Sequence, residues 1–365
     1  MGAELRYIPD YAVSPGATLR EILDDKGISQ TDLAVRTGLA EKTISQIING
    51  IAPLTYETAE KFELALGVPA RFWNTRELHY REALSRTEED RRLADDVEWL
   101  SDVPVSSLIE RGFIEESDSA SEKVKSVLSF FGVSSVDAWR NAWLNPCGQY
   151  RGKEAQRRKP GHVAAWLRMG ELVAEQVKCE PFDAKRFRET LDDIRALTTS
   201  PARQWKAELQ RRCAAVGVAV VVIKEIPGAS VNGVAKWLKK DTALIQLSLK
   251  YKTDDQFWFT FYHEAGHICL HGKRQIFVDD GLSNEDADEK EANQFARDIL
   301  IPQRLVGRLP FLKSKAAIKM FAESIGVSPG IVVGRLQHDG VLKPQFCNDL
   351  KVRLAWQSNL NEQGK

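Results

Sequence analysis

The change from helical to strand-like periodicity near residue 215 constrains the fold of this 365-residue chain most strongly. After that point comes GVAVVVI (217–223), a continuous β-branched run typical of a buried strand. VNGVAKWL (231–238) and TALIQLSL (242–249) are two further strand candidates, and a helix over about 255–271 should follow them. Three strands and a helix joined by short turns predict an α+β domain around a small, mostly antiparallel sheet.

Helical patterns on both sides of this region divide the chain into four parts. We expect an all-α domain at 10–84, a charged linker and mostly helical middle region at 85–210, the α+β domain at 211–310, and a helical C-terminal segment at 311–365. The expected fold class is therefore multidomain. A basic run at 151–159, RGKEAQRRK, stays unassigned between a solvated loop and a nucleic-acid contact.

Composition argues against several classes of protein. Lys and Arg number 51, as do Asp and Glu, so no global field directs the chain to DNA or to a membrane. The five cysteines include no CxxC pair, which argues against a disulfide framework and a cysteine zinc site. The longest apolar run, CAAVGVAVVVI (213–223), is far shorter than the roughly 20 residues that span a bilayer. We therefore expect a cytoplasmic protein without a membrane partner.

Three of the six histidines lie within YHEAGHICLH (262–271). On a helix, His263 and His267 share one face about 6 Å apart, so both imidazoles can reach one ion. His271 lies about 12 Å along the axis from His263, which is too far for all three to share an ion at bonds of about 2.1 Å. Only the first pair encloses a glutamate, Glu264, next to its first histidine. This is H-E-x-x-H, in which the glutamate takes a proton from metal-bound water. The alternative is an ordinary helix with a packed row of histidines.

A catalytic zinc site takes three protein ligands and leaves one position to water. Beyond residue 271 the only histidine is His338, so we expect a carboxylate as the third ligand. Within EDADEKEANQFARDILIP (285–302), Glu291 adjoins the apolar residues of the helix, and the motif spacing favours Glu289 and Asp288 less. A plain charged helix start, favoured by the helix dipole, is the alternative. The candidates are Glu285, Asp286, Asp288, Glu289, Glu291 and Asp298.

FWFTFYHEAGHICLH and EKEANQFARDILIP together resemble the ImmA/IrrE-type metallopeptidases, which are gluzincin-like enzymes. The resemblance covers about 215–305. It implies that His263, His267 and Glu291 bind Zn²⁺ and that Glu264 is the general base. It also implies proteolysis of repressors or stress regulators. A substrate peptide would most simply bind as an extra strand along 231–238 or 243–249.

SQTDLAVRTGLAEKTISQIING (29–50) has the spacing of a helix-turn-helix. Ala34 allows close helix contact, Gly38 allows the tight turn, and Ile44 and Ile47 supply core. The segment resembles the repressor/Cro-like (XRE) family, and residues 15–84 resemble its HigA-type antitoxin version. By that likeness Gln30 starts the helix that meets the DNA backbone, and Asn49 lies near a phosphate. Four residues face the major groove: Glu41, Lys42, Thr43 and Gln46.

The charge of this segment bears on its partner. Residues 1–86 contain ten Lys and Arg against twelve Asp and Glu, a net charge of −2. DNA affinity rests largely on neutralised phosphates, so one copy should bind weakly. We therefore expect a homodimer on a double-stranded, two-fold operator. Binding of these helices only to another protein is the alternative.

The C-terminal stretch KMFAESIGVSPGIVVGRL (319–336) repeats the helix-turn-helix spacing. Gly330 and Gly334 weaken its second helix, and the exposed positions of that helix carry little that could recognise bases. We therefore expect this stretch to pack against the peptidase domain.

These features favour a cytoplasmic DNA-binding regulator with a zinc-dependent endopeptidase domain. Its expected partners are operator DNA, a protein substrate or a cognate toxin, and a second copy of the chain. The alternative is a non-enzymatic, antitoxin-like repressor in which the metal is structural or sensory. The intact H-E-x-x-H favours the enzyme, because a structural site needs no base.

Overall fold

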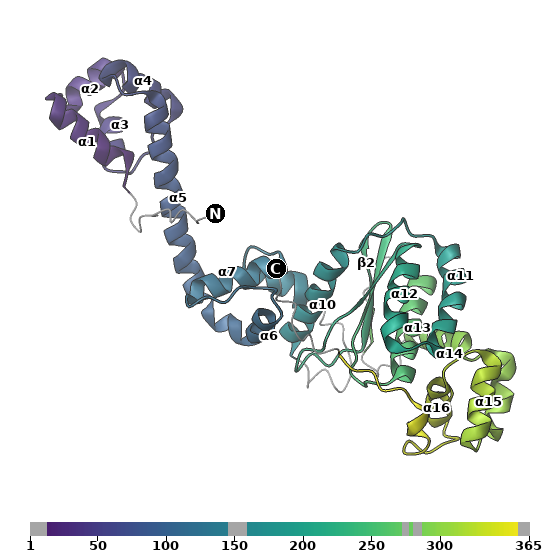
Figure 1. Cartoon of the computed structure of the whole chain (residues 1–365). Coiled ribbons are helices and arrows are strands. Elements are labelled where there is room, and N and C mark those ends of the chain that lie inside the picture. Colours follow the sequence, from purple (N-terminus) through teal and green to yellow (C-terminus); the bar gives the residue numbers. More distant parts are fainter. Residues whose placement is uncertain (1–12, 145–158, 272–276, 280–286, 357–365) are drawn as a thin grey trace, which may run out of the picture. The chain divides into compact units, whose positions relative to one another are not determined.

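The structure is a computed structural model that describes residues 13–144, 159–271, 277–279 and 287–356 (Figure 1). Two compact units divide the chain: Met1–Val97 with Ser117–Lys125, and Glu98–Glu116 with Ser126–Lys365. The basic run at 151–159 lies outside the described residues, apart from Lys159. The helices are α1 Pro15–Lys26, α2 Gln30–Thr37, α3 Glu41–Ile48, α4 Tyr56–Leu66, α5 Ala70–Asp95, α6 Val105–Glu110, α7 Ala120–Phe131, α8 Val136–Trp139, α10 Pro160–Glu175, α11 Ala184–Arg195, α12 Ala202–Ala214, α13 Asp254–Leu270, α14 Ala287–Leu300, α15 Lys315–Ile325 and α16 Pro329–His338.

The first unit forms the short helices that the sequence predicts. Ser29 caps α2 through a capping box, in which its hydroxyl accepts from the Asp32 N–H and the Asp32 carboxylate accepts from the Ser29 N–H. Gly38 ends α2 with a φ of 69°, the conformation that allows the tight turn into α3. The charged stretch expected as a linker forms the second half of the 26-residue α5. Large, fully buried side chains lie at the centre of its core, among them Leu19, Leu33, Ile44, Phe62 and Trp73.

The second unit contains a four-stranded sheet with the order β1-β3-β2-β4. The strands are β1 Val218–Val222, β2 Gly233–Lys239, β3 Thr242–Leu247 and β4 Phe277–Asp279. β1 is parallel to β3, whereas β2 is antiparallel to both β3 and β4, so the sheet is mostly antiparallel as predicted. β3 lies between β1 and β2 over its length. The expectation that a peptide adds along 243–249 is therefore wrong for this strand, because both of its edges are paired.

Helices cover both faces of this sheet (Figure 1). On one face, α10 is held by the Trp166 ring, which donates to the Ile223 carbonyl, and by Gln246, which donates to the Trp166 carbonyl. On the other face, α12 and α13 bury Trp258 and Phe261 in one hydrophobic core with the sheet. Each large side chain removed from water stabilises such a core by about 1.5–3 kcal/mol. α13, which carries the histidines, is therefore a central helix of the unit.

The C-terminal segment holds the first turn of α13. The buried Asp254 carboxylate accepts from the Ser328 hydroxyl and from the Val352 N–H at 2.9 Å. The Asp254 N–H in turn donates to the Val352 carbonyl at 3.0 Å. Lys351 forms a 2.7 Å ion pair with the next residue, Asp255. The C-terminal stretch that repeats the helix-turn-helix spacing thus packs, through α16, against α13 of the α+β domain, as expected.

Among the described residues, no single helix is long and apolar enough to cross a membrane. α15 and α16 meet the same criteria only as a pair, which is bent by 114°.

The contact between α13 and α16 predicts a difference between two glycines. A Cβ at Gly330 would lie 2.5 Å from the Asp254 Oδ1 atom, whereas a Cβ at Gly307, within Gln303–Phe311, would meet no atom within 4 Å. Gly330→Ala should therefore destabilise the second unit by about 1–3 kcal/mol through overpacking. Gly307→Ala should change the free energy of unfolding by less than about 0.5 kcal/mol. Hydrogen exchange of the α13 amides in urea measures both, and equal protection in the two variants would contradict the tight contact.

Candidate metal centre and DNA-recognition helix

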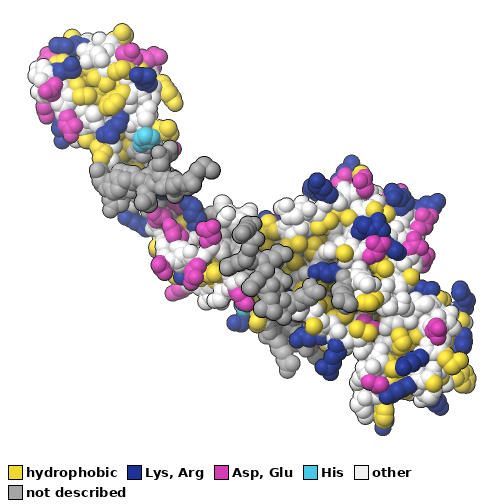
Figure 2. Space-filling model, in the orientation of Figure 1, with side chains coloured by type: hydrophobic (Ala, Val, Ile, Leu, Met, Phe, Trp, Pro, Cys, Tyr) yellow, Lys and Arg dark blue, Asp and Glu magenta, His cyan; other side chains and the backbone are white. Residues whose placement is uncertain are grey.

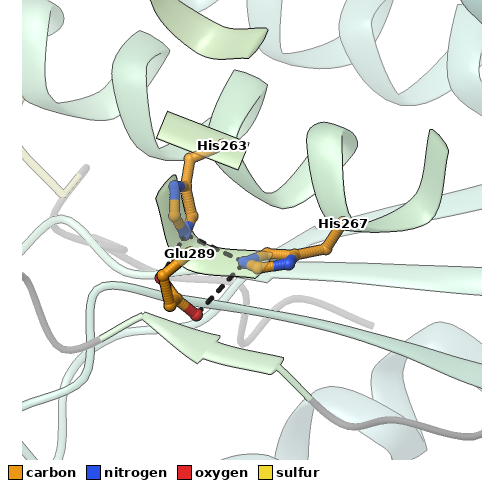
Figure 3. Close-up of side chains that lie close together, drawn as sticks. All are labelled: His263, His267 and Glu289. Atoms are coloured by element: carbon orange, nitrogen blue, oxygen red, sulfur yellow. Dashed lines mark hydrogen bonds and ion pairs between the residues drawn. The ribbon is translucent and has the colours of Figure 1, made fainter. Parts of the chain in front are cut away.

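The two histidines of H-E-x-x-H lie on the buried face of α13. Both side chains are almost completely buried, and their Nε2 atoms lie 3.0 Å apart. Figure 3 shows both rings turned toward one point, where the Glu289 carboxylate meets them. Glu289 Oε2 lies 3.2 Å from His263 Nε2, and Glu289 Oε1 lies 3.3 Å from His267 Nε2. Two residues of α13 and one of α14 thus converge.

The carboxylate in this cluster belongs to Glu289. The prediction of Glu291 as the third ligand is therefore corrected. The Glu291 side chain is 64% exposed and its carboxylate lies 3.4 Å from His271, outside the cluster. The reason is the helical period. Glu289 precedes Ala292 and Ala296 by three and seven residues and shares their buried face, whereas Glu291 points about 100° away from Ala292. Nearness in sequence to the apolar residues was the wrong criterion.

The other carboxylates considered do not join the cluster. Glu285 and Asp286 lie outside the described residues. Asp288 lies 3.7 Å from His271, and Asp298 accepts a hydrogen bond from Gln294 one turn earlier on α14. Within the part of the chain that the structure describes, His263, His267 and Glu289 are the group of potential ligands that comes together.

The protonation states of the cluster suit a metal. Burial raises the pKa of Glu289, but the hydrogen bonds of His263 and His267 outweigh this effect and lower it to about 2. Burial, together with the neighbouring His263 and His271, lowers the pKa of His267 more than Glu289 raises it. At neutral pH the cluster therefore holds an ionised carboxylate and a neutral imidazole, which are the forms that bind metal ions.

The spacing of the two imidazole nitrogens and of the carboxylate oxygen nearest to each also fits one ion. Two atoms bound at about 2.1 Å to one tetrahedral ion lie roughly 3.4 Å apart. The distances of 3.0, 3.2 and 3.3 Å in this cluster are close to that value. Two imidazole nitrogens and one carboxylate leave a fourth position for water or substrate, as catalytic sites do.

Glu264, the expected base, lies in contact with the sheet. Its side chain is fully buried. A Cβ at Gly233, the first residue of β2, would lie only 2.6 Å from the Glu264 Oε1 atom and 2.7 Å from Thr260 Cγ2. The missing side chain at residue 233 therefore leaves the room that the carboxylate occupies. Sequence reasoning did not find this role, because it depends on how α13 lies across β2.

Two neighbours of the motif have structural roles. Tyr262 is buried and donates its hydroxyl hydrogen bond to the Leu191 carbonyl of α11, so it supports packing. His271 follows the last residue of α13, and its N–H donates to the His267 carbonyl. His271 is thus a hydrogen-bonding residue at the helix end, and it is not in the ligand group, as its distance from His263 along the helix predicts.

Comparison with protein families identifies both parts of the chain. Residues 19–73 match the helix-turn-helix family model, and residues 218–337 match that of the IrrE N-terminal-like domain, a peptidase family. The chain joins a helix-turn-helix domain to an IrrE-like domain. No curated protein sequence matched it. The expected fusion is thereby confirmed, but the HigA-type relationship has no support. The IrrE-like match extends through α15 and almost all of α16, which agrees with their packing against α13.

The helix-turn-helix domain places α3, the expected recognition helix, at its surface. Its buried side is formed by Ile44, Ile47 and Ile48. At the end of α3 the Asn49 side chain accepts from Arg20 and donates to the Ser45 carbonyl, so it is held within the domain. Of the six residues expected at DNA, four are exposed: Gln30, Glu41, Lys42 and Asn49. The other two, Thr43 and Gln46, are half-buried.

The IrrE-like domain should depend on Glu289 for its metal. Glu289→Ala removes one of the three converging ligands, so metal affinity should fall by more than the 10–100-fold that loss of an outer hydrogen-bond partner costs. Asp298→Ala, on the same helix but outside the cluster, should bind as tightly as the wild type. Competition with a chromogenic chelator measures both dissociation constants. Equal affinity in the two variants would remove Glu289 from the site.

Proposed function

We propose that this chain is a DNA-binding transcriptional regulator whose IrrE-like domain is a zinc-dependent endopeptidase that cleaves a repressor or another regulator. The observation that carries the proposal is the convergence of His263, His267 and Glu289 beside a buried glutamate that directly follows the first ligand. A site that only held the fold together would need no such base. The match to a peptidase family supports the same interpretation.

The chain's own residues would divide the work. His263, His267 and Glu289 would hold Zn²⁺, which when bound polarises a carbonyl group and lowers the pKa of water. Glu264 would accept a proton from the attacking water and deliver it to the nitrogen of the leaving amine. Gly233 keeps the Glu264 carboxylate beside the sheet by leaving room for it. The burial of His263, His267 and Glu264, with Glu289 half-buried beside them, strengthens the electrostatic interactions that this chemistry uses.

Glu264→Gln tests the reaction. The variant keeps the shape of the side chain but has no basic oxygen, so cleavage should slow by about 10²–10⁴-fold. Zinc-loaded protein is incubated with a lysate of the source cells, and newly formed peptide N-termini are measured by mass spectrometry. Glu323→Gln, an exposed change on α15, is the matched control and should cleave like the wild type. The same new N-termini from the Glu264→Gln protein would rule out cleavage by this site. The non-enzymatic reading, in which the metal is structural or sensory, would then be preferred.

We further propose that the helix-turn-helix domain binds a two-fold operator as a homodimer. Its match to the family supports DNA binding, and the net charge of −2 over residues 1–86 favours two copies, because one copy neutralises few phosphates. The exposed Lys42 and the half-buried Gln46 lie one turn apart on α3, where both can reach base edges.

Base recognition predicts a sequence-dependent loss in these variants. Lys42→Ala or Gln46→Ala should each cost about 1–3 kcal/mol at particular operator bases. Lys61→Ala, on α4, is a control for the loss of charge alone. Titrations against operators with single base changes, at several salt concentrations, measure the effect. A loss that is the same on every sequence would mean that α3 contacts only phosphates.

A further inference from the structure

The ring nitrogen of His267 that faces away from the ligand cluster has a partner of its own. His267 Nδ1 lies 3.0 Å from His271 Nδ1. His271 is itself largely buried, with 6% of its side chain exposed, and its other nitrogen, Nε2, faces α14. There it lies 3.4 Å from the Glu291 carboxylate and 3.7 Å from that of Asp288. The residues form a row that leads from the cluster to the surface.

The positions of the hydrogens along this row follow from one requirement. His267 Nε2 must carry no hydrogen if it is to bind a cation, so its Nδ1 carries one. That N–H can donate only if His271 Nδ1 is an acceptor, which places the His271 hydrogen on Nε2. The Nε2–H group then points to Glu291 or Asp288, which are anionic acceptors. Ligation at one end therefore fixes the tautomer of both rings.

We propose that His271 and the carboxylates behind it, Glu291 above all, are positioning residues for the metal ligand His267. The proposal rests on the proposed metal site, but not on peptide cleavage. His267 has no exposed side-chain surface, so an unsatisfied ring N–H there would be costly. His271 accepts a hydrogen bond from that N–H and thereby fixes the orientation of the His267 ring. The hydrogen-bonded row also makes His267 Nε2 a stronger ligand for a cation. Glu291, expected from the sequence as a ligand, acts through two histidines.

Ligation by His271 itself does not fit this geometry. Both of its ring nitrogens face other partners, at 3.0 Å and 3.4 Å. It also lies two helical turns, about 12 Å along the axis, from His263. His271 therefore supports the ligand His267 through a hydrogen bond and does not bind the ion itself.

Zinc affinity of the full-length protein tests the proposal. His271→Phe and the double variant Asp288→Ala/Glu291→Ala should each weaken Zn²⁺ binding by about 10–100-fold. Added to His271→Phe, the two acidic changes should have no further effect, because the carboxylates act through His271. Asp298→Ala is the matched acidic control. Unchanged affinity in His271→Phe, or a full further loss from the acidic changes in its presence, would overturn the proposal.

Two further measurements separate positioning from folding and from catalysis. The thermal midpoint of the zinc-free double variant should equal that of the wild type, since Glu291 is mostly exposed. A lower midpoint accompanied by wild-type affinity would make the role structural and overturn the proposal. The same losses of affinity are expected in the Glu264→Gln background. Failure of the protein with Glu264 intact to cleave peptides, while these losses of affinity are still measured, would count against the endopeptidase function alone.

Discussion

The close approach of α13 and α14 is the constraint on which the candidate metal centre depends. A Cβ at Gly266 would lie 3.1 Å from the Cα atom of Ala292 and 3.2 Å from the Phe295 ring, so the two helices touch through their smallest residues. Glu289 is one turn before Ala292 and thereby reaches the imidazoles of α13. A larger residue at this contact would separate the helices, and the three ligand atoms would no longer meet.

The ligands and the base depend on different neighbours. The helix pair holds the ligands, whereas the sheet, through Gly233, sets the place of the Glu264 carboxylate. Burying three ionisable side chains and half-burying a fourth, Glu289, costs free energy unless each has a partner. The anionic Glu289 between two imidazoles, and the row from His267 toward α14, show how that cost is offset. The surrounding apolar core keeps both arrangements rigid.

Local periodicity was sufficient to predict much of this fold. The three longer strands, α13, and the pair His263 and His267 follow from patterns within about ten residues. β4 was missed because it has three residues and exists through its pairing with β2. Glu289 could have been found, since it shares a helical face with Ala292. The roles of Gly233 and Tyr262 could not, because they depend on elements far away in the sequence.

The pairing of the start of α13 with the segment near Val352 also has a consequence for how the protein is made. Asp254 and Val352 are 98 residues apart. At about 5–20 residues per second, a ribosome needs roughly 5–20 s to reach the second after the first. During that interval the helix-turn-helix domain can already fold, while the first turn of α13 still lacks its hydrogen-bond partners from the C-terminal segment. The helix-turn-helix domain can therefore be complete before α13 has all of its contacts.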